Sequence, residues 1–111
     1  MSAFQKKFDQ AIWEVVVNIP AGCVMGYGEV ARAAGFPRHA RMVSKAMGRS
    51  KEPLPWFRVV RSDRTLAFDT DSEAYQKQSA LLEQEGAKLL NGKVIPVQTD
   101  LDKSLDKLLW G

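Results

Sequence analysis

Two side chains in this 111-residue sequence could take part in nucleophilic chemistry, and each type occurs once. A cysteine thiolate such as that of Cys23 needs a base within reach, and His39 is the histidine that could act as one. His39 would lie on the far side of two predicted helices from Cys23. We therefore interpret Cys23 as a packed thiol rather than a nucleophile.

Other routes to catalysis also lack their residues. One cysteine and one histidine are too few for an internal disulfide or a zinc site, so no metal is expected. The sequence holds no glycine-rich loop of the Walker or dinucleotide-binding kind. Composition therefore indicates a binding protein without a cofactor rather than an enzyme.

Positive charge is concentrated in the middle of the chain. Residues 32–64 hold nine Lys/Arg against two acidic residues, a local excess of seven, although the net charge of the whole chain is +3. Residues 65–111 hold five lysines against eight carboxylates. Clustered positive charge in a small domain is typical of a protein that binds a polyanion, most often a nucleic acid, although a solvated basic surface remains an alternative.

Periodicity and turn residues predict three helices before residue 50. The first is amphipathic, can be capped by Ser2 and stops at Pro20. The second covers residues 28–35 and closes at Gly35, and the third takes Pro37 into its first turn. Two short helices joined by a tight turn, the second of them basic, are typical of a helix-turn-helix. The residues on the outward face of the third helix are basic or small: Arg41, Ser44, Lys45 and Gly48.

The second half of the chain predicts mixed structure. Residues 57–60 alternate as a short strand would, and Thr70-Asp71-Ser72-Glu73 reads as a capping box that starts a helix. Asn91-Gly92 between two apolar runs predicts a type I′ hairpin, and leucines over residues 101–109 predict a last helix. We expect a single domain over residues 1–111, soluble and cytoplasmic, because no apolar run is long enough to span a bilayer.

Several ordered blocks together resemble the C-terminal domain of the O6-alkylguanine-DNA alkyltransferases. They are Ile19-Pro20-Ala21-Gly22-x-Val24-x-x-Tyr27-Gly28-Glu29-Val30-Ala31, Pro37-x-x-Ala40-Arg41-x-Val43-x-x-Ala46-Met47, Pro55-x-x-Arg58-Val59-Val60 and Leu81-Leu82-x-x-Glu85-Gly86. The match covers roughly residues 4–90. It implies a mainly α fold with a small β element, of the winged helix-turn-helix kind.

The active-site block departs from the family pattern. Where the alkyltransferases carry Pro-Cys-His-Arg-Val, this chain carries Trp56 and Phe57 in place of the cysteine and the histidine. Neither ring can act as nucleophile or base. Tryptophan at this position marks the alkyltransferase-like proteins, which resemble the enzymes in DNA binding but do not transfer the alkyl group. Glu85, similar to the acid that supports the family's histidine, would keep a structural role at most.

The resemblance also implies which residues meet DNA. Arg41 is similar to the arginine finger that fills the space of an extruded base, and Tyr27 to the tyrosine that promotes rotation of the nucleotide. Trp56, Tyr27, Met47 and Val59 would line the pocket for the flipped base. The remaining DNA contacts, with the minor groove in this family, would be Gly28, Arg38, His39, Ala40, Ser44, Lys45, Arg49, Arg61, Ser62 and Arg64.

We therefore expect a monomeric protein that binds O6-alkylguanine in double-stranded DNA by nucleotide flipping and presents it to nucleotide excision repair proteins. Two other interpretations stay open. One is a helix-turn-helix regulator that reads sequence, and the other is an alkyltransferase that uses Cys23. Asp69 stands near a position where some relatives carry a basic residue that contacts the lesion, so it cannot repeat that contact.

Overall fold

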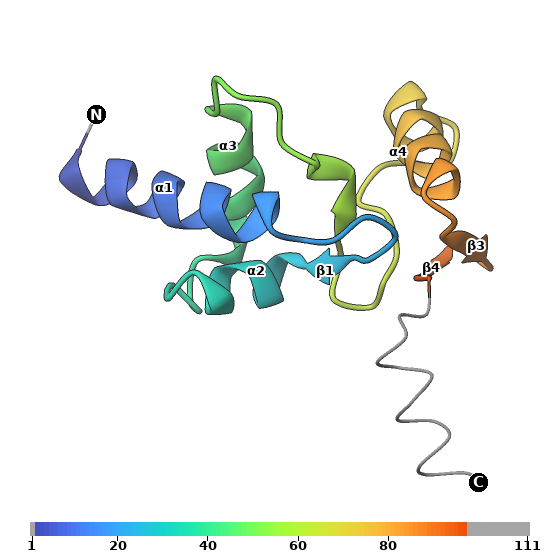
Figure 1. Cartoon of the computed structure of the whole chain (residues 1–111), viewed down its shortest axis with the longest axis horizontal. Coiled ribbons are helices and arrows are strands. Elements are labelled where there is room, and N and C mark those ends of the chain that lie inside the picture. Colours follow the sequence, from blue (N-terminus) through green and yellow to red (C-terminus); the bar gives the residue numbers. More distant parts are fainter. Residues whose placement is uncertain (1, 98–111) are drawn as a thin grey trace, which may run out of the picture.

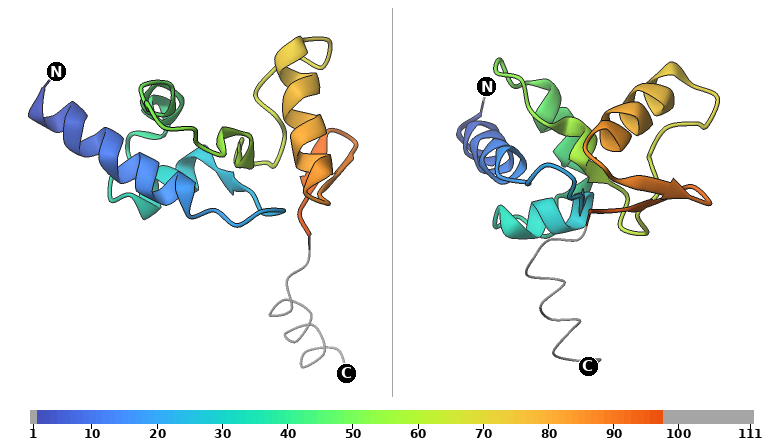
Figure 2. Two further views of the ribbon diagram at one scale, coloured as in Figure 1. Left: turned by 45° about the horizontal axis from the view of Figure 1, so that its top comes forward. Right: turned by 45° about the vertical axis from the view of Figure 1, so that its right-hand side comes forward.

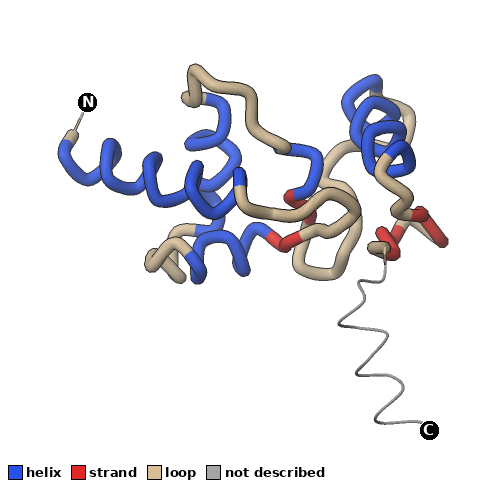
Figure 3. The backbone as a smooth tube through the Cα atoms, in the orientation of Figure 1, coloured by secondary structure: helices blue, strands red, loops and turns tan. Residues whose placement is uncertain are grey.

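Helices and loops make up most of the fold, with two short two-stranded sheets (Figures 1 and 3). The computed structural model describes residues 2–97. The last helix predicted, over residues 101–109, lies outside this range. No helix among the described residues is long and apolar enough to cross a membrane.

The first helix, α1 (Ala3–Val17), forms as its sequence predicts. The Ser2 hydroxyl caps it by accepting a hydrogen bond from the backbone N–H of Gln5 at 3.0 Å. Phe8, Ile12 and Val16 recur at helical spacing and are fully buried. The helix ends at Val17, so the chain has already turned before Pro20.

The predicted helix-turn-helix is present, but its second helix starts late. It comprises α2 (Tyr27–Ala33), a short 3-10 turn η1 (Ala40–Met42) and α3 (Val43–Gly48). The expectation that Pro37 lies in the first turn of the third helix is wrong. Phe36 folds back and donates its N–H to the Ala31 carbonyl at 2.8 Å, which makes residues 36–39 part of the turn. Figure 2 shows α1, α2 and α3 gathered at one end of the molecule.

A short parallel pairing joins the helix-turn-helix to the block around Trp56. Strand β1 (Met25–Gly26) leads into α2 and pairs with β2 (Val59–Val60). The strand predicted over residues 57–60 is half correct, because the 3-10 turn η2 (Trp56–Arg58) takes its first two residues. Val59 and Val60 pack into different clusters of buried side chains, so this strand forms the boundary between them.

The helix α4 (Glu73–Gln84) starts later than the predicted capping box requires. Its cap is Ser72, whose hydroxyl accepts from the Tyr75 N–H at 3.1 Å and donates to the Asp69 carbonyl at 2.7 Å. Thr70 therefore lies outside the helix, and the capping-box prediction is wrong by two residues. Ser72 is preferred because the Asp69–Ser72 turn directs its hydroxyl at the first free N–H groups.

The predicted hairpin is confirmed. Strands β3 (Lys88–Leu90) and β4 (Lys93–Ile95) pair antiparallel across Asn91 and Gly92, whose φ angles of 53° and 80° suit a type I′ turn. Val94 is buried against α4 residue Leu82 and holds the hairpin on the fold. The hairpin and α4 lie together at the opposite end of the molecule from the start of α1 (Figure 1).

Candidate nucleic-acid interface

Trp56 lines a cavity between the helix-turn-helix and α4. The cavity measures about 280 Å³, and its lining comes from α2, α3, η2, α4 and the loops between them. The residues that line it are Tyr27, Ser44, Met47, Gly48, Leu54, Trp56, Phe68 and Gln78. None of these side chains carries a formal charge at neutral pH, so the cavity is suited to an uncharged group.

The tight turn η2 fixes the Trp56 ring. The backbone N–H of Trp56 donates to the Leu54 carbonyl at 2.8 Å, and the backbone N–H of Arg58 donates to the Pro55 carbonyl at 3.0 Å. The indole meets the Phe57 ring edge-on at 6.0 Å and the Phe68 ring edge-on at 6.5 Å. Such edge-to-face pairs are favourable, so the indole is braced from two sides.

Arg58 and Glu85 anchor this turn to the rest of the fold. The Arg58 guanidinium pairs with the Glu85 carboxylate and donates to the Ile19 carbonyl at 2.7 Å. Glu85 also accepts the Gly22 N–H at 3.1 Å. The hydrogen bond from Arg58 holds the pKa of Glu85 below its usual value. Glu85 therefore has a structural role in this protein, as the absence of a neighbouring histidine predicts.

Gln78 is a site residue that the sequence analysis missed. It is 2% exposed, and its amide nitrogen donates to the Phe57 carbonyl at 3.1 Å and the Val59 carbonyl at 3.2 Å. These bonds fix the backbone that carries Trp56. The signal was available, because Gln78 lies four residues before Leu82 and therefore shares the buried face of α4.

Tyr27 and Arg41 meet at a second, more open depression. It is lined by Tyr27, Ala40, Arg41, Ser44 and Ala67, and it shares Tyr27 and Ser44 with the Trp56 cavity. Burial raises the pKa of the Tyr27 phenol, against the opposing charge of Arg61, so the phenol stays neutral at physiological pH. Arg41 is exposed and lines this depression, but not the Trp56 cavity.

One predicted pocket residue lies elsewhere. Tyr27, Met47 and Trp56 line the cavity together, but the side chain of Val59 is 1% exposed and packs in the core. The expectation that Val59 lines the pocket is therefore wrong for its side chain. Strand pairing with Met25 turns Val59 toward the α1 side of the fold.

Most of the residues predicted to contact DNA have no side-chain partner described within the protein. Gly28 lies beside the Ser62 side chain, at the N-terminal end of α2. Ala40 lines the open depression with Arg41. The charged or hydroxyl side chains that are exposed are Arg38, Arg41, Ser44, Lys45, Arg61 and Ser62.

Three of the residues predicted to contact DNA have partners inside the protein. Arg49 holds the buried Asp9 with two hydrogen bonds of 2.7 Å, and Arg64 pairs with Glu29. His39 packs among the rings of Phe4, Phe8 and Phe36, and its Nδ1 is buried without a partner. These contacts give all three a structural role.

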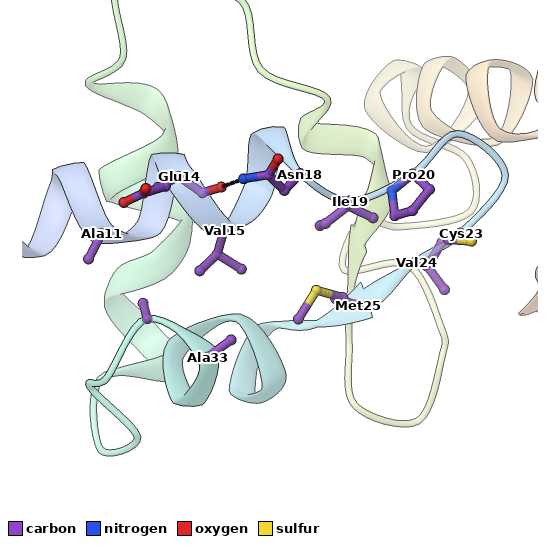
Figure 4. Close-up of a pocket in the computed structure, with 11 residues that line it drawn as sticks. Ala11, Glu14, Val15, Asn18, Ile19, Pro20, Cys23, Val24, Met25 and Ala33 are labelled. Atoms are coloured by element: carbon purple, nitrogen blue, oxygen red, sulfur yellow. Dashed lines mark hydrogen bonds between the residues drawn. The ribbon is translucent and has the colours of Figure 1, made fainter.

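Cys23 lies in a different groove from Trp56. The groove runs between α1 and α2, with Cys23 near the end closest to Pro20 (Figure 4). It shares no lining residue with the Trp56 cavity. His39 does not line the groove either, so the structure does not bring together the thiol and base that transfer through Cys23 would need.

Comparison with known proteins agrees with this geometry. The family model described as "6-O-methylguanine DNA methyltransferase, DNA binding domain" matches residues 7–87. The "DNA base-flipping protein" of Escherichia coli (strain K12) is 40% identical over 81 residues, which cover 71% of this chain and 63% of that protein. "Alkyltransferase-like protein 1" of Schizosaccharomyces pombe is 36% identical over 85 residues, which cover 75% of this chain and 79% of that protein.

The fold is also that of a solved protein–DNA complex. S. pombe Atl1, in complex with damaged DNA containing O6-carboxymethylguanine, superposes with a TM-score of 0.67 at 35% identity. The superposition covers 86% of this chain and 84% of that one. The predicted fold class, mainly helical with a small sheet, is confirmed. The chain belongs to the family of the 6-O-methylguanine DNA methyltransferase DNA-binding domain.

Proposed function

We propose that this protein binds O6-alkylguanine in duplex DNA by rotating the nucleotide into the Trp56 cavity, and that it does not transfer the alkyl group. The observation that carries the proposal is the position of Trp56. Its indole lines the cavity at the place where the related methyltransferases carry a cysteine, and the next residue is Phe57. Aromatic stacking or edge contact with a purine is worth about 1–3 kcal/mol per base.

The surroundings of the cavity support nucleotide flipping. Arg41 and Tyr27 line the open depression that adjoins it, and Tyr27 lines both. A flipped base leaves a gap in the duplex, and an arginine side chain can fill that gap and hydrogen-bond the orphaned cytosine. The names of the E. coli and S. pombe relatives agree with this role.

Absence of alkyl transfer follows from the chemistry of the lining. Transfer needs a nucleophile activated by a base, and the cavity is lined by neither a cysteine nor a histidine. Cys23 opens onto the other groove. We therefore propose a recognition protein whose complex with the lesion persists until another factor acts.

One titration tests the proposal and its two rivals. Two duplexes of identical sequence, one with guanine and one with O6-methylguanine, are titrated while tryptophan fluorescence and the intact mass of the protein are followed. We expect tighter binding to the methylated duplex, a fluorescence change and no gain in mass. Equal affinities would contradict lesion recognition and favour a sequence-reading regulator. A gain of one methyl group on Cys23 would show an alkyltransferase.

The proposed partners of the bound complex are nucleotide excision repair proteins. This step is supported by the resemblance to the alkyltransferase-like proteins, and the acidic second half of the chain is a candidate docking surface. In a host that lacks excision repair, loss of this protein should add no further sensitivity to methylating agents. Added sensitivity would show that its pathway is a different one.

A further inference from the structure

The groove between α1 and α2 takes no part in the proposed lesion site. It has a volume of about 510 Å³ and runs from Ala11 on α1 to Cys23 in the loop that follows (Figure 4). Its α2 side is formed by Ala33 and Ala34, at the end of that helix. Glu14 is the one charged residue among the described residues that line it. Such a lining is suited to apolar side chains.

The last described residue lies beside one end of this groove. The backbone N–H of Val97, which follows strand β4, donates to the Gly22 carbonyl at 2.9 Å. Gly22 immediately precedes Cys23, which lines the groove. Residues 98–111 come next in the sequence and lie outside the described residues. Three extended residues span about 10 Å, so residues 101 and beyond are within reach of the groove.

The sequence after Val97 contains an apolar face that needs cover. Leu101, Leu105 and Leu108 recur at the spacing of one helical face. Lys103 and Lys107 fall on the opposite face of such a helix, where water can solvate them. A helix with one apolar face is stable only when that face packs against another part of a protein.

The dimensions of the helix and the groove agree. A helix of residues 101–110 would be about 15 Å long, and residues 11–18 of α1, which border the groove, extend over about 12 Å. A helix that enters at the Cys23 end would therefore lie along α1 toward Ala11. Leu101 would then lie nearest to Cys23, and Leu108 nearest to Ala11.

The other depression beside α1 is less suited to this segment. It is lined by the apolar side chains of Trp13, Val17 and Leu54, but half of its lining residues are charged. These charged residues are Glu14, Arg49, Lys51 and Glu52. Leucines packed there would remove charged groups from water, which is unfavourable. The groove between α1 and α2 is therefore the better site for an apolar face.

We propose that residues 98–111 pack as a helix in the groove between α1 and α2, with their leucines against its apolar lining. The docked segment covers the half-buried thiol of Cys23 and braces α1 against the first helix of the helix-turn-helix. This docking is independent of lesion recognition, because the groove shares no lining residue with the Trp56 cavity.

The rate at which Cys23 is alkylated tests the docking. The full chain is treated with iodoacetamide under native conditions, and its intact mass is followed with time. Cys23 is the one cysteine in the sequence, so the gain in mass reports on it alone. Leu105→Asp combined with Leu108→Asp should raise the rate about tenfold, because two carboxylates would not enter an apolar groove. An unchanged rate would refute the docking.

A matched control separates docking from a general effect of added charge. Leu90 is 59% exposed on β3 and does not line the groove. Leu90→Asp should therefore leave the rate of Cys23 alkylation unchanged. An equal rise in Leu90→Asp and in the double variant would contradict a specific contact between the leucines and the groove.

A disulfide gives a second measurement, because an unfolded variant would also be alkylated faster. In a Cys23→Ser background, Ala11→Cys is combined with Leu108→Cys, and mild oxidation should join the two in most of the protein. Val17, 55% exposed on α1, lines the other depression. Val17→Cys with Leu108→Cys is the matched pair and should join far less. Preferential joining through position 17, or joining through neither position, would overturn the proposal.

Discussion

Trp56 and Phe57 are neighbours in the sequence, but their side chains have different surroundings. Trp56 faces the cavity, whereas Phe57 packs into the cluster of buried residues around Leu82. The Phe57 ring also lies 5.3 Å from the Arg58 guanidinium and edge-on to the indole. The resemblance to the methyltransferases puts Phe57 at the position of their histidine base, so we expect that a cysteine introduced at position 56 alone would not be activated.

At the same scale, Arg41 should control discrimination between damaged and intact DNA. Replacing it with alanine removes the guanidinium that adjoins the cavity, so rotation of the nucleotide would leave an unfilled gap. We expect Arg41→Ala to lower the ratio of affinities for O6-methylguanine and guanine duplexes by about tenfold, or ~1.4 kcal/mol. Arg38→Ala, an exposed arginine three residues earlier, is the control and should weaken both duplexes alike. An unchanged ratio for Arg41→Ala would remove its assignment as the finger.

The ion pair between Arg58 and Glu85 should make stability depend on pH. Because the pKa of Glu85 is lowered in the folded protein, its ion pair stabilises the fold above the usual value of 4.5 and is lost as the pH falls through the lowered value. Urea unfolding at about pH 6 should show Glu85→Gln less stable than the unaltered protein by about 1.5–3 kcal/mol. This difference should shrink toward about pH 3. Glu83→Gln, an exposed neighbour on α4, should show no comparable pH dependence, and a constant deficit for Glu85→Gln would contradict the pairing.

At the scale of elements, the sequence predicts those helices and turns that depend on neighbouring residues in the chain. The helix α1 and the hairpin turn at Asn91-Gly92 follow from a cap, a periodic apolar face and two residues that tolerate positive φ. The strand expected at residues 57–60 is only half present, because hydrogen bonds within residues 54–58 curl its start and pairing with β1 straightens its end. The extent of this strand therefore depends on pairing with a distant segment, which the local sequence pattern does not predict.

The sequence predicts part of the candidate site. Tyr27, Met47 and Trp56 were expected together and meet at the cavity. Phe68 is not predictable in this way, because its place at the cavity depends on the path of a loop. The spacing of Gln78 from Leu82 predicts its burial, but its role in the site depends on carbonyls about twenty residues earlier in the chain. A buried glutamine is informative only when the groups that satisfy it are known.

The start of α4 offers a test of one such error. Sequence suggested that Thr70 caps this helix, whereas the structure gives the cap to Ser72. Ser72→Ala should therefore lower the free energy of unfolding by about 1 kcal/mol, because it leaves the Tyr75 N–H without its acceptor. Thr70→Ala is the matched control and should change it by less than about 0.5 kcal/mol. Denaturant unfolding of the two variants side by side measures the difference, and the reverse order would restore the capping box.

At the scale of the whole molecule, pairing reduces the positive charge that the sequence suggests is available. Of the nine basic residues in 32–64, Arg49, Arg58 and Arg64 are each neutralised by a carboxylate. Arg38, Arg41, Lys45 and Arg61 are exposed on or near the helix-turn-helix and the adjoining loop. Arg32 and Lys51 are exposed as well. Affinity for the DNA backbone should therefore come from these exposed side chains rather than from every basic residue of the segment.

The dependence of binding on salt tests this distribution of charge. Each phosphate contact releases condensed counterions, so the logarithm of the binding constant falls with the logarithm of salt concentration by about 0.9 per contact. Lys45, exposed on α3, is proposed to make one such contact, so Lys45→Ala should reduce the slope by about one while leaving the preference for alkylated guanine intact. Lys77, exposed on α4 in the acidic half of the chain, is the matched control, and Lys77→Ala should leave the slope unchanged. Titrations of both variants across a series of salt concentrations give the slopes directly. If the two substitutions reduced the slope equally, the DNA would be bound over the whole surface, and the helix-turn-helix would lose its assignment as the interface.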